Sequence, residues 1–175
     1  MLEPRLQVRK SISGQARTSP PKIAWIIPEN NNRLHKPGDL QEVDDAPQVL
    51  RDALVRRAAE HGCTTTDLRR LDGMVDREFP RRNLTDGQAA GIGARMRAEI
   101  VVYGNLDGWA RGSLFGSSTT VKFRLDVVDS SGTPLAHLDQ DGTAAQEDPS
   151  DLADSLAHQV IDSLIGVWGG CGTGS

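Results

Sequence analysis

Three side chains that could bind a metal ion lie at alternate positions in the last third of the chain. They are His137, Asp139 and Asp141. Successive side chains of a β-strand point to opposite faces, so this spacing would place all three on one face of a strand. Imidazole and carboxylate groups are ligands for divalent cations. A metal cluster is therefore one interpretation of this motif.

A hairpin register explains the same residues without a metal. The segment DSSGT is typical of a turn, and if Ser131 and Gly132 end the loop, paired residues have numbers that sum to 263. One face then carries complementary pairs, each of which contributes roughly 0.2–1 kcal/mol: Lys122 with Asp141, Arg124 with Asp139, and Asp126 with His137. The other face carries apolar pairs: Leu125 with Leu138, and Val127 with Ala136. We favour this register and expect no metal site.

Motifs of enzymes are not found elsewhere in the chain. The segment GIGARM (91–96) is superficially similar to a dinucleotide-binding loop, but it has no third glycine and lies inside a predicted helix. The sequence has no GxxxxGK[ST] phosphate loop and no GxSxG nucleophile elbow. We therefore predict no catalytic residues, no cofactor and no enzymatic activity.

Charge is unevenly distributed along the 175 residues, although the net charge is only −4. Residues 1–22 hold five Lys/Arg and one Glu, whereas the chain from Leu125 onward holds nine Asp/Glu and no Lys or Arg. One interpretation is a solvated acidic face with a basic disordered tail; the other is a molecule with two electrically opposite ends that attract each other between copies. Nucleic acid is not an expected partner, because the folded part is acidic and has no aromatic platform.

Hydrophobic periodicity predicts one α/β domain over 22–169, between a flexible basic tail (1–21) and a Gly-rich flexible tail (170–175). An apolar strand at 22–28 precedes a helix that starts at Asp45 and stops at Gly62, and a short strand follows at 63–66. Two helices come next, the second opened by a Thr85–Gln88 capping box. Strands near 100–103, 121–127 and 134–141 and a helix from Asp148 complete the order β-α-β-α-α-β-β-β-α. The expected fold is a three-layer-like single domain with a mixed sheet of about five strands flanked by helices.

The segment from Gly104 to Ser117 is rich in glycine and is predicted to be a loop. It carries Trp109, Leu114 and Phe115, which either fold over the core as a cap or form an apolar contact surface for a partner. The two interpretations differ in the solvent exposure of Trp109. We take the three side chains as a candidate contact surface.

The two cysteines, Cys63 and Cys171, indicate neither a disulfide framework nor a zinc site by their number and spacing. No apolar run approaches the ~20 residues that a membrane-spanning helix needs, and the N-terminus lacks the apolar core of a signal peptide. We expect either a cytoplasmic protein or a protein whose export signal has been removed from this chain.

Several blocks of the sequence resemble a bacterial superfamily. The blocks are KIAWIIPENN, QVLRDALVRRAAEHG, LTDGQAAGIGARMRAEIVVYGNLDGW, VKFRLDVVDSSGTPL and the final helix ending in VWG, which together span nearly all of 22–169. They are similar to the superfamily of bacterial envelope proteins and lipoproteins that includes CsgG, LpoB, PelC and the N-terminal domain of TolB. The resemblance implies a small α/β domain that has a non-catalytic role in the cell envelope. It carries over no individual functional residue.

The expected function is that of an envelope-associated accessory or assembly protein that acts by protein–protein contact, in a secretion, cell-wall or outer-membrane complex, and that self-assembles. Its location would be the periplasm or the inner face of the outer membrane, with membrane association only through an anchor absent from this chain. The alternative is a cytoplasmic small-molecule-binding or regulatory module. Its ligand would lie outside the carboxyl ends of the strands, at loops that contain Glu29, Asn30, Asn31, Asn105 and Asp107.

Overall fold

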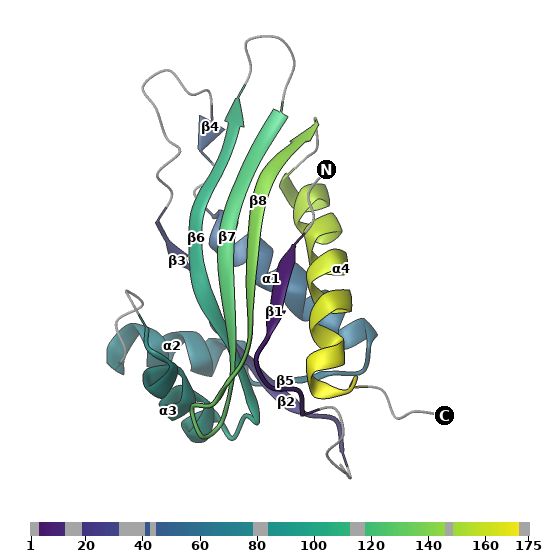
Figure 1. Ribbon diagram of the computed structural model, residues 1–175. Helices are drawn as coiled ribbons and strands as arrows, with labels where there is room; N and C mark the ends of the chain where they lie inside the picture. The colour runs from purple at the N-terminus through teal and green to yellow at the C-terminus, as the bar shows by residue number, and fades with distance from the viewer. Residues whose placement is uncertain are drawn as a thin grey trace.

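The computed structural model describes residues 4–12, 19–31, 41–42, 45–78, 84–112, 118–145 and 149–171 (Figure 1). Its helices are α1 (Ala46–Glu60), α2 (Leu68–Glu78), α3 (Asp86–Met96) and α4 (Pro149–Trp168). Its strands are β1 (Arg5–Val8), β2 (Lys22–Trp25), β3 (Glu29–Asn30), β4 (Gln41–Glu42), β5 (Thr64–Thr65), β6 (Ile100–Gly112), β7 (Ser118–Asp129) and β8 (Pro134–Ala145). Apart from the short strands β1, β3 and β4, the order is the predicted one.

All strands of the described residues join one mixed sheet, in the order β1-β8-β7-β6-β2-β5. The short strands β3 and β4 also pair with β6. Strands β6, β7, β8 and β1 form an antiparallel set, while β2 runs parallel to both β6 and β5. The predicted α/β class with a mixed sheet is therefore confirmed, with more strands than expected.

The sheet separates two hydrophobic cores. The larger one lies between the sheet and the helices α1 and α4, and its side chains include Val102, Leu125 and Leu156. The smaller one lies on the opposite face under α2 and α3, and includes Val101 and Ile92. Neighbouring residues of β6 thus enter different cores, because side chains alternate along a strand. Figure 1 shows α2 and α3 at one end of the long strands, so these helices cover only part of their face.

Local sequence signals set the helix ends. Helix α1 has proline in its first turn and is followed by Gly62, whose φ of 83° favours glycine. Helix α3 begins with the predicted capping box, in which the Thr85 hydroxyl accepts a hydrogen bond from the Gln88 N–H. Helix α4 buries the predicted stripe: Leu152, Leu156, Val160, Leu164 and Trp168. None of the helices among the described residues is long and apolar enough to cross a membrane.

The predicted hairpin register is confirmed. Strands β7 and β8 pair Lys122 with Asp141, Arg124 with Asp139 and Asp126 with His137. In the turn, the Asp129 carboxylate accepts hydrogen bonds from the Ser131 hydroxyl and from the N–H groups of Ser131 and Thr133. Partial burial alone would raise the pKa of Asp129, but these hydrogen bonds outweigh it and lower the pKa.

The predicted loop from Gly104 is instead largely strand. Strand β6 continues to Gly112 and pairs with β7 throughout, with a register shift between Leu106 and Gly108. Glycine is required at 104 because a Cβ there would lie 1.9 Å from the carbonyl oxygen of Arg124. The sequence pattern suggested a loop, whereas the close approach of two strand backbones explains the glycine.

The N-terminal segment differs from the predicted flexible tail. Residues 5–8 form β1, which pairs antiparallel with β8 and places Arg5 beside Asp139 and Leu6 beside Leu138. The chain then crosses the end of α4, where the Ile12 N–H donates to the Val167 carbonyl at 2.8 Å and the Ile12 side chain is buried. The strand is short and carries an exposed arginine, which suits the edge of a sheet.

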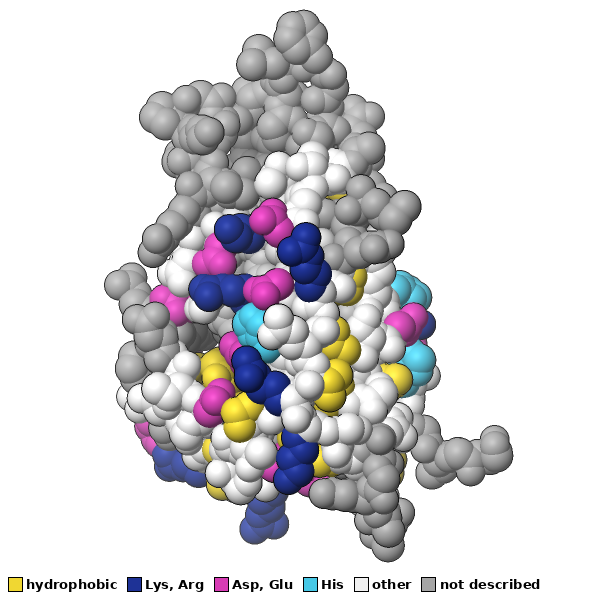
Figure 2. Space-filling model, viewed as in Figure 1, with side chains coloured by type: hydrophobic (Ala, Val, Ile, Leu, Met, Phe, Trp, Pro, Cys, Tyr) yellow, Lys and Arg dark blue, Asp and Glu magenta, His cyan; other side chains and the backbone are white. Residues whose placement is uncertain are grey.

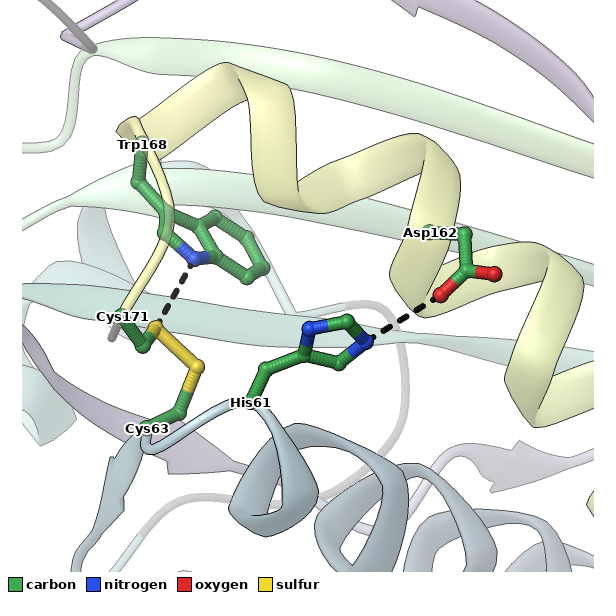
Figure 3. The surroundings of a disulfide bond; sticks show 5 residues. All are labelled: His61, Cys63, Asp162, Trp168 and Cys171. Carbon is green, nitrogen blue, oxygen red and sulfur yellow. Dashed lines mark hydrogen bonds and ion pairs between the residues drawn. A yellow bond between two sulfur atoms is a disulfide. The ribbon is translucent and has the colours of Figure 1, made fainter. Parts of the chain in front are cut away.

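The prediction that the cysteines form no disulfide is wrong. Cys63 and Cys171 are bonded, and both are buried. Figure 3 shows the bond between the residue that precedes β5 and the segment that follows α4. The indole N–H of Trp168 donates to the Cys171 sulfur at 3.2 Å. The bond therefore ties the end of α4 to the β5 side of the sheet.

Opposite charges that are far apart in the sequence meet within the fold. Helices α1 and α4 pack together, and ion pairs between them join Arg56 to Asp154 at 2.9 Å and Arg57 to Asp162 at 3.0 Å. His61 adds a contact of 3.3 Å to Asp162 (Figure 3). Carboxylates of the acidic last third are thus partly neutralised by cations of α1 within one molecule.

Candidate functional site: the open face of the sheet

The part of the sheet that α2 and α3 leave uncovered carries a group of charged and polar side chains, here called the open face. Figure 2 shows basic, acidic and histidine side chains close together on this side of the molecule. The open face comprises Arg5, Gln7, Glu29, Asn105, Asp107, Lys122, Arg124, Asp126, His137, Asp139 and Asp141. Its cations are outnumbered by its carboxylates, so the surface is mixed in sign with an acidic excess.

One row of register partners crosses five strands. It runs from Arg5 on β1 through Asp139, Arg124 and Asn105 to Glu29 on β3. When its amide group is turned to donate, Asn105 lies 3.0 Å from Glu29 Oε2. Arg124 Nε also donates to Asp107 Oδ2 at 3.2 Å. The sign of charge alternates from Arg5 through Asp139 to Arg124, and the row ends at Glu29, which is buried.

A second row centres on His137, which lies between two carboxylates. Its Nδ1 is 2.7 Å from Asp126 Oδ1, and its Nε2 is 3.1 Å from Asp139 Oδ2. Partial burial would by itself lower the pKa of His137, but the hydrogen bond to Asp126 and the charges of Asp126 and Asp139 raise it above 6.5. The geometry suits an imidazolium ion that donates from both ring nitrogens.

Tyr103 marks the border between the open face and α3. Its hydroxyl donates to Asp86 Oδ1 in the first turn of α3. Burial, with a further contribution from this hydrogen bond, raises the pKa of Tyr103 well above its ordinary value. The phenol therefore stays neutral and anchors α3 to the sheet.

The predicted ligand-edge residues meet in a strand ladder. Glu29 pairs with Asn105, Asn30 pairs with Leu106, and the Asn31 N–H donates to the Leu106 carbonyl at 2.8 Å. They lie at the side of β6, which continues past them, and not around the carboxyl end of a strand. Asp107 lies at the register shift of β6, and its carboxylate forms an ion pair with Arg124. The two segments are adjacent as predicted, while ligand binding by them stays a prediction.

The candidate contact surface is not supported at Trp109. This side chain has 0% exposure and lies in the larger core, because the register shift at Asp107 turns it inward. Leu114 and Phe115 lie outside the described residues. For Trp109 the structure agrees with the alternative in which it packs into the core.

The described residues offer neither a metal cluster nor a pocket at the open face. Among the residues that the structure describes, no group of three or more His, Cys, Asp or Glu could hold a metal ion. A niche of about 150 Å³ lies elsewhere, between α1 and α4, over Ala53 and Ala157. On the open face, ion pairs join Arg124 to Asp107 and His137 to Asp126 and Asp139.

Three structural features were missed from the sequence: β1, the disulfide and the buried Arg51. Arg51 lies on α1 and forms two hydrogen bonds to the Asp72 carboxylate, at 2.9 and 3.0 Å. The presence of two cysteines was a signal for the disulfide. A single arginine within the apolar stripe of α1 was a signal for the buried ion pair.

The order of the elements and the sheet topology define a single-domain α/β protein with a mixed sheet. No family model and no curated protein matches the sequence significantly. Among solved structures, it is similar to the PelC dodecamer from Paraburkholderia phytofirmans, with TM-score 0.62, 16% identity, and coverage of 94% of this chain and 97% of that chain. This likeness shows a shared fold and confirms the fold implied by the sequence resemblance.

Two further solved structures are weaker likenesses. Lipoprotein GNA1162 from Neisseria meningitidis gives TM-score 0.45 and 17% identity over 83% of this chain and 96% of that chain. The LpoB C-terminal domain from Escherichia coli gives TM-score 0.44 and 16% identity over 78% and 90%.

Proposed function

We propose that this chain is a non-catalytic accessory or assembly protein of the bacterial cell envelope that acts through contact of its open face with protein surfaces, including other copies of itself. The observation that carries the proposal is the row of charged and polar side chains that runs from Arg5 on β1 across β8 and β7 to Asn105 on β6. Such a surface favours specificity and rapid association more than it favours catalysis. The fold likeness to PelC, which forms a dodecamer, supports the assembly part of the proposal.

The disulfide supports an envelope location over the cytoplasmic alternative. Disulfides persist in oxidising compartments such as the periplasm and are rare in the cytosol. The Cys63–Cys171 bond is buried, and Trp168 contacts one of its sulfurs. A buried bond that connects distant parts of a core is suited to a structural role.

Thiol trapping in intact bacteria tests the location. Cells are acid-quenched and treated with a bulky maleimide before and after reduction. An envelope protein has Cys63 and Cys171 oxidised, so the mass shift requires the reductant. Full alkylation without reductant would contradict the proposed compartment and favour the cytoplasmic module.

Light scattering over a range of protein concentrations tests the contact role. We expect assemblies larger than a monomer, and we expect Lys122→Glu on the open face to weaken them. The matched control is Arg69→Glu, because Arg69 is an exposed cation on α2. A monomer at every concentration, or equal effects of the two substitutions, would remove assembly through the open face.

A further inference from the structure

Strand β1 ends the sheet on the β8 side. Among the described residues, β8 is the one strand that pairs with it, and Figure 1 shows β1 beside β8 at that margin. Half of the backbone N–H and C=O groups of an edge strand point away from the sheet and can pair with an added strand. The outer edge of β1 is therefore a candidate docking site.

The register identifies which groups face outward. The Arg9 N–H donates to the Leu135 carbonyl at 2.8 Å, which continues the pairing of Gln7 with His137 and Arg5 with Asp139. Hydrogen-bonded and non-bonded pairs alternate along antiparallel strands, so the residues at 5, 7 and 9 bond to β8. The backbone groups of Leu6 and Val8 consequently point to the outer edge.

The side chains along this edge differ between its two faces. Leu6 and Val8 lie on the face that packs on α4, and Val8 is 52% exposed, the one exposed large hydrophobic side chain among the described residues. Arg5, Gln7 and Arg9 are exposed on or next to the open face. Lys10 is also exposed, and residues 5–12 contain no acidic side chain. An added strand would therefore meet basic groups on one face and an aliphatic group on the other.

This pattern disfavours a second β1 as the occupant. If two copies paired antiparallel with Gln7 opposite Gln7, Arg5 of each copy would lie opposite Arg9 of the other. Like charges directly opposite each other destabilise a strand pair. Basic residues on an edge strand thus oppose pairing between identical edges.

We propose that the outer edge of β1 binds an extended segment of a partner protein in which carboxylate and aliphatic side chains alternate. Its carboxylates lie against Arg5 and Arg9, its aliphatic side chains lie against Leu6 and Val8, and its backbone completes the hydrogen bonds of Leu6 and Val8. This proposal rests on the proposed function, because it specifies one kind of protein contact. It adds a strand to the sheet and leaves the central rows of the open face accessible.

The probe is a short, capped, fluorescent peptide of alternating glutamate and valine, tested on the full chain by anisotropy and by amide hydrogen exchange in NMR. We expect fast exchange at Leu6 and Val8 in the free protein, and protection of these two amides when the peptide is added. A matched peptide of alternating lysine and valine should bind about tenfold more weakly or worse. Added salt should weaken binding of the glutamate peptide.

Two variants separate backbone pairing from charge. Val8→Pro removes an outward N–H at a position where an edge strand tolerates proline, and should abolish binding, whereas Val8→Thr keeps the N–H and should retain it. Arg9→Glu should shift the binding preference toward the lysine peptide.

Three outcomes would each overturn the proposal. They are the absence of binding, equal binding of both peptides, and protection of the two amides in the free protein at high concentration, which indicates a second copy at the edge. None of these results alters the thiol-trapping test or the effect of Lys122→Glu, so the proposed function is judged separately.

Discussion

Cys63 and Cys171 are bonded across a sequence separation of 108 residues. Cys63 directly precedes β5, and Cys171 follows the last turn of α4. The disulfide therefore closes a loop of the chain. This loop contains the short strand β5, the helices α2, α3 and α4, and the antiparallel strands β6, β7 and β8. Both cysteines are buried members of the larger core, so the bond lies inside it.

Replacing both cysteines by serine should lower the free energy of unfolding by about 2–5 kcal/mol, because closure of a loop of this size restricts the unfolded chain. Urea unfolding, followed by tryptophan fluorescence, measures the change. A reductant should lower the midpoint of the wild-type chain toward that of the double variant and leave the double variant unchanged. A double variant with the wild-type midpoint would show that the bond does not contribute to stability.

His137 should make the stability of the sheet dependent on pH. Its pKa is raised above 6.5 in the folded state by Asp126 and Asp139, so the stabilising contribution is fully present below about pH 6.5 and is lost as the pH rises through the folded value. We expect His137→Gln to destabilise the chain more at about pH 5.5 than at about pH 8.5. Unfolding at both pH values gives the difference.

NMR titration provides an independent check of the same site. The imidazole of His137 should titrate above 6.5, and Asp126→Asn should lower that pKa because it removes the first carboxylate partner. A titration midpoint below 6.5 in the unaltered chain would contradict the assignment of an imidazolium between two carboxylates.

Gly104 and Gly91 should respond oppositely to substitution by alanine. A Cβ at 104 would lie 1.9 Å from a backbone oxygen of β7, whereas a Cβ at 91 meets nothing within 4 Å. Gly104→Ala should cost at least about 1–3 kcal/mol through overpacking. Gly91→Ala lies within α3 and should stabilise the chain by up to about 1 kcal/mol. Thermal unfolding of both variants tests whether β6 continues through residue 104.

The sequence predicts those parts of the fold that local periodicity encodes. Alternating apolar and charged residues around DSSGT were sufficient to predict the β7–β8 register, because opposite charges on one face and apolar pairs on the other agree in one alignment only. The capping box of α3 and the apolar stripe of α4 are local in the same sense. The open-face residues of β7 and β8 follow directly from that register.

Features that depend on contacts between distant segments were not predictable in this way. The partner of β1 is β8, more than half a chain away, and the alternation of two polar with two aliphatic residues is too short to mark a strand. The glycines of β6 have the local signature of a loop, whereas Gly104 is required by the close approach of the β7 backbone. The pairing of Cys63 with Cys171 depends on how α1 and α4 pack, which no spacing rule gives.

Arg51 and Asp72 should show strong and asymmetric coupling. Arg51 is 3% exposed and forms two hydrogen bonds to Asp72, while Asp72 lies within α2 with its side chain 28% exposed. Removing the carboxylate by Asp72→Asn leaves a buried guanidinium with one remaining acidic partner, Asp52, and should cost about 3 kcal/mol. Arg51→Met keeps the aliphatic packing and leaves a carboxylate that water can reach, so it should cost less.

The double variant Arg51→Met/Asp72→Asn should be close in stability to Arg51→Met alone, because the second substitution then removes a group that has already lost its partner. A double-mutant cycle from urea unfolding measures this coupling. Additive losses, or a larger loss for Arg51→Met than for Asp72→Asn, would mean that the pair is solvated and that it does not contribute to stability through a link between α1 and α2. The expected asymmetry follows from burial, since the less exposed charge is the more costly one to leave without its partner.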